Sequence, residues 1–169
     1  MNLGNIAGEI CKALFPINDK VFFGNPNSST AVCTLSSMKL FKEIADSSLM
    51  SKIAVVGRLL SENRGIDSLV KYVISNTNIK TIFICGKDTS GHKPGHSLLN
   101  LYKNGIDDDG RIIDSSSPDP ILTLTQSQID EFQRQVKFVN KIGETSISQI
   151  KSSLDSIYKS SNHFSVFLD

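Results

Sequence analysis

Residues Ile79–Gly86 read IKTIFICG, with four consecutive apolar residues from Ile82 to Cys85 ahead of a glycine. A short apolar run that ends at glycine is typical of a strand buried on both faces of a parallel sheet. A second run, Ile53–Val56, ends in the same way at Gly57. These two runs predict the central strands of the fold.

The segments around these strands alternate between helical and extended patterns. Apolar residues recur at helical spacing in Leu40–Ala45, Gly65–Ser75, Ser97–Lys103 and Gln126–Ile142. Further strands are expected at Lys20–Gly24 and Thr30–Leu35, which are joined by a turn at residues 25–28. The order strand, helix, strand, helix predicts a Rossmann-like α/β fold, in which helices flank a mainly parallel sheet.

A length of 169 residues suits a single domain with its own core. We expect an α/β domain over residues 1–143, with a helix at Met1–Phe15 and a compact core over residues 20–143. The remaining residues, 144–169, contain eight serines. They are expected to form a marginal amphipathic helix through Ile147, Ile150, Leu154 and Ile157, and an edge strand at Phe164–Leu168.

Charge and cysteine content exclude several classes of protein. Lys and Arg number 18 against 17 Asp and Glu, and this balance argues against a nucleic-acid binder. Cys11, Cys33 and Cys85 lie among apolar neighbours, which indicates buried thiols in a reducing compartment. No segment reaches the roughly 18 apolar residues of a membrane-spanning helix, and Met1–Phe15 lacks the pattern of a signal peptide. We therefore expect a cytoplasmic protein without a membrane segment in this chain.

The loop after the second apolar run is the strongest candidate site. It covers residues 85–96 and reads CGKDTSGHKPGH. Parallel sheets bind ligands at the carboxyl ends of their strands, where this loop is expected. Its glycines could adopt positive φ angles and let a ligand approach closely. A neutral imidazole such as that of His92 can coordinate a transition metal, and Asp88 or a backbone carbonyl could orient its second nitrogen.

Other interpretations of this loop stay open. Glycine-rich turns between strand and helix are common in parallel sheets, and their histidines can simply cap a helix or fill space. A zinc-dependent hydrolase would use His92, His96 and Asp88, although Pro94 and Gly95 disfavour one helix through both histidines. A phosphate-binding loop is disfavoured because the Lys-Ser/Thr ending of such a loop is missing.

Several segments, taken in order along the chain, resemble one known family. They are residues 61–67 (SENRGID), 73–79 (VISNTNI), 84–95 (ICGKDTSGHKPG), 98–99 (LL), 104–107 (NGID), 109–112 (DGRI) and 132–136 (FQRQV). They resemble the corrinoid-binding domain in the A subunit of tetrahydromethanopterin S-methyltransferase, and the resemblance as a whole extends over roughly residues 20 to 143.

This resemblance implies a cobalamin-binding domain that carries methyl groups and acts with separate methyltransferase proteins. The family's Gly-His-x-x-Gly motif provides the lower axial ligand of cobalt, which corresponds to His92 here. No catalytic residue is assigned, because the cofactor supplies the chemistry. The expected cofactor-binding residues follow the two apolar runs: Gly57, Ser61, Glu62, Asn63, Gly65, Gly86, Asp88, Thr89, Ser90, Gly91, His92 and Gly95.

Three features depart from the family pattern. The carboxyl end is polar and serine-rich where the family has a membrane helix. Arg64 stands where the family loop usually carries an apolar residue, and His96 is an additional histidine. These departures leave open a binding or regulatory module that keeps the fold but takes another ligand, such as a nucleotide.

Overall fold

The structure is a computed structural model, and it describes residues 21–165. The helix expected at Met1–Phe15 and the thiol of Cys11 lie outside the described residues. The strands are β1 (Phe22–Phe23), β2 (Thr30–Cys33), β3 (Val55–Gly57), β4 (Thr81–Gly86) and β5 (Lys137–Ile142). The α-helices are α2 (Met38–Ala45), α3 (Arg64–Ser75), α4 (Pro94–Asn104), α5 (Gln126–Gln135) and α6 (Ile147–Ser165), with a 3₁₀ turn η1 at Ser48–Ser51.

The five strands form one sheet in the order β1-β3-β2-β4-β5. Strand β2 pairs in parallel with both β3 and β4, so that Val32 lies between Val56 and Phe83. Strand β5 is parallel to β4, and only the short β1 is antiparallel to its neighbour. The predicted Rossmann-like α/β fold with a mainly parallel sheet is therefore confirmed, with the two apolar runs supplying β3 and β4.

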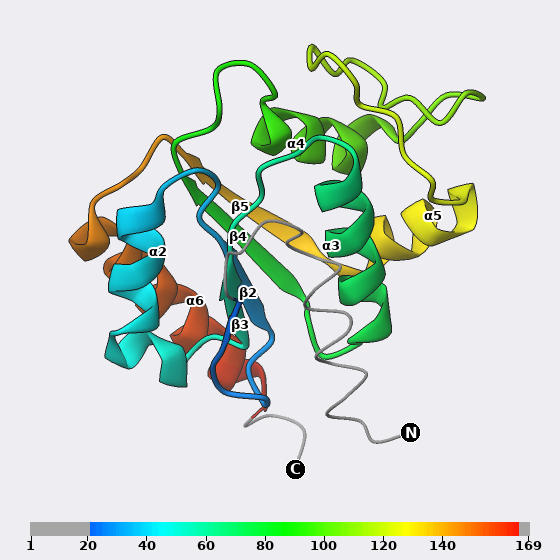
Figure 1. Ribbon diagram of the computed structural model, residues 1–169. Coiled ribbons are helices and arrows are strands. Elements are labelled where there is room, and N and C mark those ends of the chain that lie inside the picture. The colour runs from blue at the N-terminus through cyan, green and yellow to red at the C-terminus, as the bar shows by residue number, and fades with distance from the viewer. Residues whose placement is uncertain (1–20, 166–169) are drawn as a thin grey trace, which may run out of the picture.

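Helices cover both faces of this sheet (Figure 1), with α3, α4 and α5 on one side and α2 and α6 on the other. Each face has its own buried cluster, because successive strand residues point to opposite faces. The first cluster joins Cys33, Ile82 and Ile84 of the sheet to Ile66, Val70, Leu98 and Phe132 of the helices. The second joins Val32, Val56, Phe83 and Cys85 to Leu40, Phe41, Ile44, Ile150 and Leu154.

The single long helix expected over Gln126–Ile142 is wrong in its second half. Helix α5 ends at Gln135, and residues 137–142 form strand β5. Phe138 packs against the first cluster and Val139 against the second, as expected for neighbouring residues of a strand. The open edge of β4 supplies the hydrogen-bonding partner that makes this segment extended, a condition that helical spacing does not reveal.

Helix α6 confirms the helical pattern of the serine-rich segment. Its residues Ile150 and Leu154 are buried in the second cluster, and Lys52 Nζ lies 2.5 Å from Asp155 Oδ1. The edge strand expected at Phe164–Leu168 is wrong at residues 164 and 165, which continue the helix, while residues 166–168 lie outside the described chain. Within residues 21–165, no helix is both long and apolar enough to cross a membrane.

Candidate functional site

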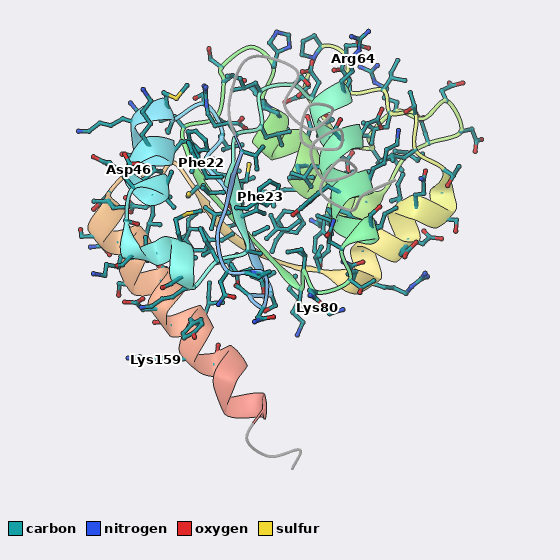
Figure 2. The ribbon with its side chains drawn as sticks, turned by 60° about the horizontal axis from the view of Figure 1, so that its bottom comes forward. Phe22, Phe23, Asp46, Arg64, Lys80 and Lys159 are labelled. Carbon is teal, nitrogen blue, oxygen red and sulfur yellow. The ribbon has the colours of Figure 1, made fainter. Side chains whose placement is uncertain are left out.

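The candidate site lies at the edge of the sheet where the parallel strands end. The loop after β3 leads into α3, and the loop after β4 leads into α4. In Figure 2, Arg64 at the start of α3 marks this edge, and Lys80, just before β4, marks the opposite one. The fold thus brings two loops that are 30 residues apart in sequence to one side of the molecule, as expected for parallel strands.

His92 and Glu62 meet between these loops. The imidazole Nδ1 of His92 lies 3.1 Å from Glu62 Oε1 and 3.0 Å from Oε2. The Glu62 side chain is only 2% exposed, whereas the His92 side chain is 62% exposed. Because a carboxylate can only accept hydrogen bonds, Nδ1 carries the proton in this contact. The neutral imidazole then presents the lone pair of its outer nitrogen, Nε2.

Asp88 has a different role from the one expected for it. Its Oδ2 accepts the backbone N–H of His96 at 2.9 Å, and its Oδ1 accepts those of Gly95 and Thr89, both at 3.1 Å. Asp88 therefore caps the first turn of α4, where a negative charge is favourable. The expectation that Asp88 or a backbone carbonyl orients His92 is wrong, because Glu62 holds that position.

The glycines of the β4–α4 loop do not share one role. Only Gly86 has the positive φ that the sequence pattern predicts for all three. A Cβ at Gly95 would lie 3.0 Å from atoms of Leu35 and Asp88, so this glycine permits packing within the protein. A Cβ at Gly91 would meet nothing within 4 Å. Gly91 is therefore the glycine of this loop that leaves open space beside His92.

Most of the remaining predicted residues build the loops themselves. The hydroxyl of Ser61 accepts the N–H of Gly65 at 2.8 Å, and the side chain of Asn63 accepts that of Arg64 at 2.7 Å. Both contacts satisfy backbone donors at the start of α3. The carbonyl of Gly57 accepts a hydrogen bond from Thr34 N inside the sheet.

Two hydroxyls of the β4–α4 loop differ in exposure. Thr89 Oγ1 is buried without a hydrogen-bond partner among the described residues, which costs free energy. Ser90 is exposed. Of the two, Ser90 is therefore the one that a polar group from outside the chain can reach.

A third segment, residues 114–120, contacts both members of the His92–Glu62 pair, although no sequence pattern indicates it. Ser117 Oγ donates to the backbone carbonyl of His92 at 2.5 Å, and Asp119 N donates to Glu62 Oε1 at 3.2 Å. The segment reads DSSSPDP, a composition typical of any surface loop. The buried positions of Ser117 and Pro120 become visible only in three dimensions.

The arrangement does not suit a bare metal ion. Among the described residues, no three His, Cys, Asp or Glu side chains gather where they could hold one. In the zinc set considered above, His96 Nε2 is 2.9 Å from Asn100 Nδ2, and Asp88 is used by backbone donors. One imidazole with an open nitrogen, oriented by a carboxylate, instead fits a metal whose other ligands come from a macrocycle. The residues present therefore fit the single axial ligand that a corrinoid needs.

Comparison with known proteins gives consistent matches. Residues 11–164 match the family model for the A subunit of tetrahydromethanopterin S-methyltransferase. A Methanosarcina barkeri protein, which is named as the A subunit of the methyltransferase Mtx, is 38% identical over 128 residues, or 75% of this chain and 61% of the relative.

Two further relatives are named as the A subunit of tetrahydromethanopterin S-methyltransferase. The relative from Methanosphaera stadtmanae is 36% identical over 78% of this chain and 52% of its own length. The relative from Methanothermobacter thermautotrophicus is 33% identical over 80% of this chain and 56% of its own length. The chain thus matches between about half and two thirds of the length of these proteins.

Proposed function

The chain belongs to the family of the tetrahydromethanopterin S-methyltransferase A subunit, and on this premise we propose that it is a cobalamin-binding methyl carrier whose His92 is the lower axial ligand of cobalt. The observation that carries the proposal is the contact of His92 Nδ1 with the buried carboxylate of Glu62. When bound, a corrinoid supplies a cobalt centre that accepts and releases a methyl group.

The contact with Glu62 fixes the state of the His92 ring in the protein without cofactor. By accepting the Nδ1 proton, the carboxylate selects the tautomer whose Nε2 can donate its lone pair. The carboxylate also fixes the direction of the ring, so that Nε2 points away from Glu62 toward a metal. Because the imidazole is 62% exposed, a planar ligand much larger than the loop can reach it.

The neighbouring loop residues suit the remaining surface of a corrinoid. The corrin ring is edged with amide side chains, which need hydrogen-bond partners. Ser90 is exposed and can contact such amides. The space beside Gly91 lets the backbone come close to the ring.

A methyl carrier needs other proteins to load and unload it. We expect separate methyltransferase proteins to approach the face of the cofactor opposite His92. The chain itself provides the axial ligand and the loops that position the cofactor. By itself it is expected to bind cobalamin without turnover.

The test is to mix the protein with hydroxocobalamin, pass it through gel filtration and record the visible spectrum. The protein should retain colour with a spectrum altered by histidine ligation, and His92→Ala should lose that alteration. His96→Ala is the matched control, because His96 lies in the same region and its ring nitrogen Nε2 hydrogen-bonds Asn100 of the same helix. The His96→Ala variant should bind as the unchanged protein does.

Loss of all colour on the column, or identical spectra for the unchanged protein and His92→Ala, would refute the axial-ligand role.

Thermal unfolding distinguishes this proposal from the alternative of a regulatory module that binds a nucleotide. A ligand at 100 times its Kd adds about 2.7 kcal/mol, which raises Tm by roughly 5–10 °C in a chain of this size. Such a rise with ATP or GTP but not with hydroxocobalamin would favour a nucleotide-binding module instead.

A further inference from the structure

The segment between Ile112 and Ile121 is a closed loop that lies against the candidate site. Ile112 N donates to the carbonyl of Pro120 at 2.9 Å, and Arg111 and Ile121 form an antiparallel bridge. These contacts fix the base of the loop. The residues between these contacts are therefore held close to the candidate site.

Three serine hydroxyls form a buried chain between this loop and α4. Ser97, in the first turn of α4, is 0% exposed, and Ser117 is 3% exposed. Ser97 Oγ lies 2.8 Å from Ser115 Oγ and 2.6 Å from Ser117 Oγ. Ser117 Oγ in turn donates to the carbonyl of His92 at 2.5 Å.

The direction of these hydrogen bonds follows from proton counting. A serine hydroxyl has one proton to donate. Because Ser117 gives its proton to the His92 carbonyl, it must accept one from Ser97, and Ser97 must accept one from Ser115. All three donors then point along one path that ends at His92. Hydrogen bonds in such a chain strengthen one another, including the bond to the His92 carbonyl.

The same loop also reaches the partner of His92. Two residues after Ser117, the N–H of Asp119 donates to Glu62 Oε1 at 3.2 Å. Asp119 Oδ2 accepts from Asn63 Nδ2 at 3.0 Å, which ties the loop to the start of α3. One segment therefore contacts both the backbone of His92 and the carboxylate that holds its ring.

Among residues 21–165, the Glu62 carboxylate and the Ser117 hydroxyl are the groups that hydrogen-bond His92 directly. Its neighbour Gly91 has open space around it, and its other neighbour, Lys93, has a left-handed φ of 42°. The imidazole is mostly exposed, so packing does not fix it. We propose that Ser117 is a positioning residue for His92, which holds the backbone so that Nδ1 stays on Glu62 and Nε2 keeps one direction. The effect on cobalt ligation rests on the proposed function, whereas the effect on the imidazole does not.

The test compares Ser117→Ala with Ser116→Ala. Ser116 is exposed in the same loop and belongs to none of these hydrogen bonds, so it is the matched control. The first readout is the ¹⁵N NMR signal of the histidine rings in protein without cofactor. In Ser117→Ala, the His92 signals should move from those of the fixed Nδ1–H form toward the average of both tautomers. They should stay unchanged in Ser116→Ala.

The second readout is the affinity for hydroxocobalamin, which should fall about 10-fold in Ser117→Ala, the low end of the effect of losing a partner of a metal ligand, because Ser117 acts on the ring through the His92 backbone. Unchanged His92 ring signals in a folded Ser117→Ala protein would overturn the inference. If no protein binds hydroxocobalamin but the ring signals move, the proposed function fails and the positioning role stands. If Ser117→Ala does not fold, Ser97→Ala provides the test, because it breaks the serine hydrogen-bond chain one step before Ser117. Unchanged His92 ring signals in Ser97→Ala would contradict the proposal.

Discussion

Two glycines of the β4–α4 loop, Gly86 and Gly91, should differ in how well they tolerate substitution by alanine. Gly86 has φ +79°, and a Cβ there would lie 2.3 Å from the carbonyl oxygen of Thr34. Gly86→Ala should therefore lower the free energy of unfolding by roughly 2–4 kcal/mol, because left-handed strain adds to a backbone clash. Gly91→Ala should change it by less than about 0.5 kcal/mol, since a Cβ at Gly91 meets nothing. Urea unfolding of the two variants measures both effects.

Gly91→Ala also tests the proposed position of a corrinoid beside His92. If the corrin approaches the backbone beside His92, the added methyl should weaken hydroxocobalamin binding without changing stability. A folded Gly91→Ala protein with unchanged affinity would remove Gly91 from the cofactor site. Equal destabilisation by both substitutions would contradict the difference in space around the two glycines.

The pairing of His92 with Glu62 shows what local sequence patterns leave out. Glu62 is among the expected cofactor-binding residues, but the local pattern favours Asp88, only four residues from His92, as the acid that orients it. The contact forms instead between loops that follow different strands, so its distance in sequence is large. Ser117 escapes sequence reasoning for a related reason, since a serine in a Ser/Pro loop has no local sign of burial. The resemblance to the family singled out His92 as a proposed ligand, whereas its contacts with Glu62 and Ser117 are visible only in the fold.

At the scale of elements, the largest difference between prediction and structure is the end of α5. Gln135 is the last residue of the helix, and its Nε2 donates to the carbonyls of Val73, Asn76 and Ile79 at 2.7, 3.0 and 3.1 Å. This side chain ties α5 to the end of α3 and so fixes where the helix stops. The apolar spacing continues through Val136 and Val139 and fits either a helix or a strand. Strand β5 thus depends on the contacts of Gln135 with α3 and on the open edge of β4. Both are tertiary contacts, so the apolar spacing could not predict the strand.

Helix α6 is expected to be part of the folding unit and not an appendage. Leu154 is 2% exposed in the second cluster. Leu154→Ala should therefore lower the free energy of unfolding by about 2–5 kcal/mol, the usual cost of removing a buried leucine side chain. Ser153→Ala, on the same helix, should stay within about 0.5 kcal/mol. Equal and small effects in urea unfolding would mean that the core is stable without α6.

At the scale of the whole molecule, the central strands carry one thiol into each of the two clusters. Cys33 of β2 lies in the first cluster, and Cys85 of β4 lies in the second. The buried thiols predicted from sequence are confirmed at these two positions. Burial raises the pKa of Cys33 to about 12. Burial likewise raises the pKa of Cys85 well above its usual range, and the charge of Cys33 adds to this effect.

These raised pKa values predict a loss of stability at high pH. In the unfolded chain the thiols ionise near pH 9, whereas in the folded chain they hold their protons to higher pH. Above pH 9 the unfolded state therefore binds fewer protons, and the free energy of unfolding falls as pH rises. The contribution of the thiols is complete below pH 9 and is lost as pH rises toward 12. Each thiol should add a slope of up to about 1.4 kcal/mol per pH unit.

Urea unfolding between pH 8 and 10.5 measures this slope, with Cys11→Ser in every protein because Cys11 lies outside the described residues. Cys33→Ala and Cys85→Ala should each remove part of the slope, and the double variant should keep only what lysines and tyrosines contribute. If one substitution alone removes all of it, only one of the two clusters excludes water from its thiol. A solvated thiol ionises at the same pH in the folded and the unfolded chain. If the slope is the same in all four proteins, neither thiol is therefore buried in its cluster.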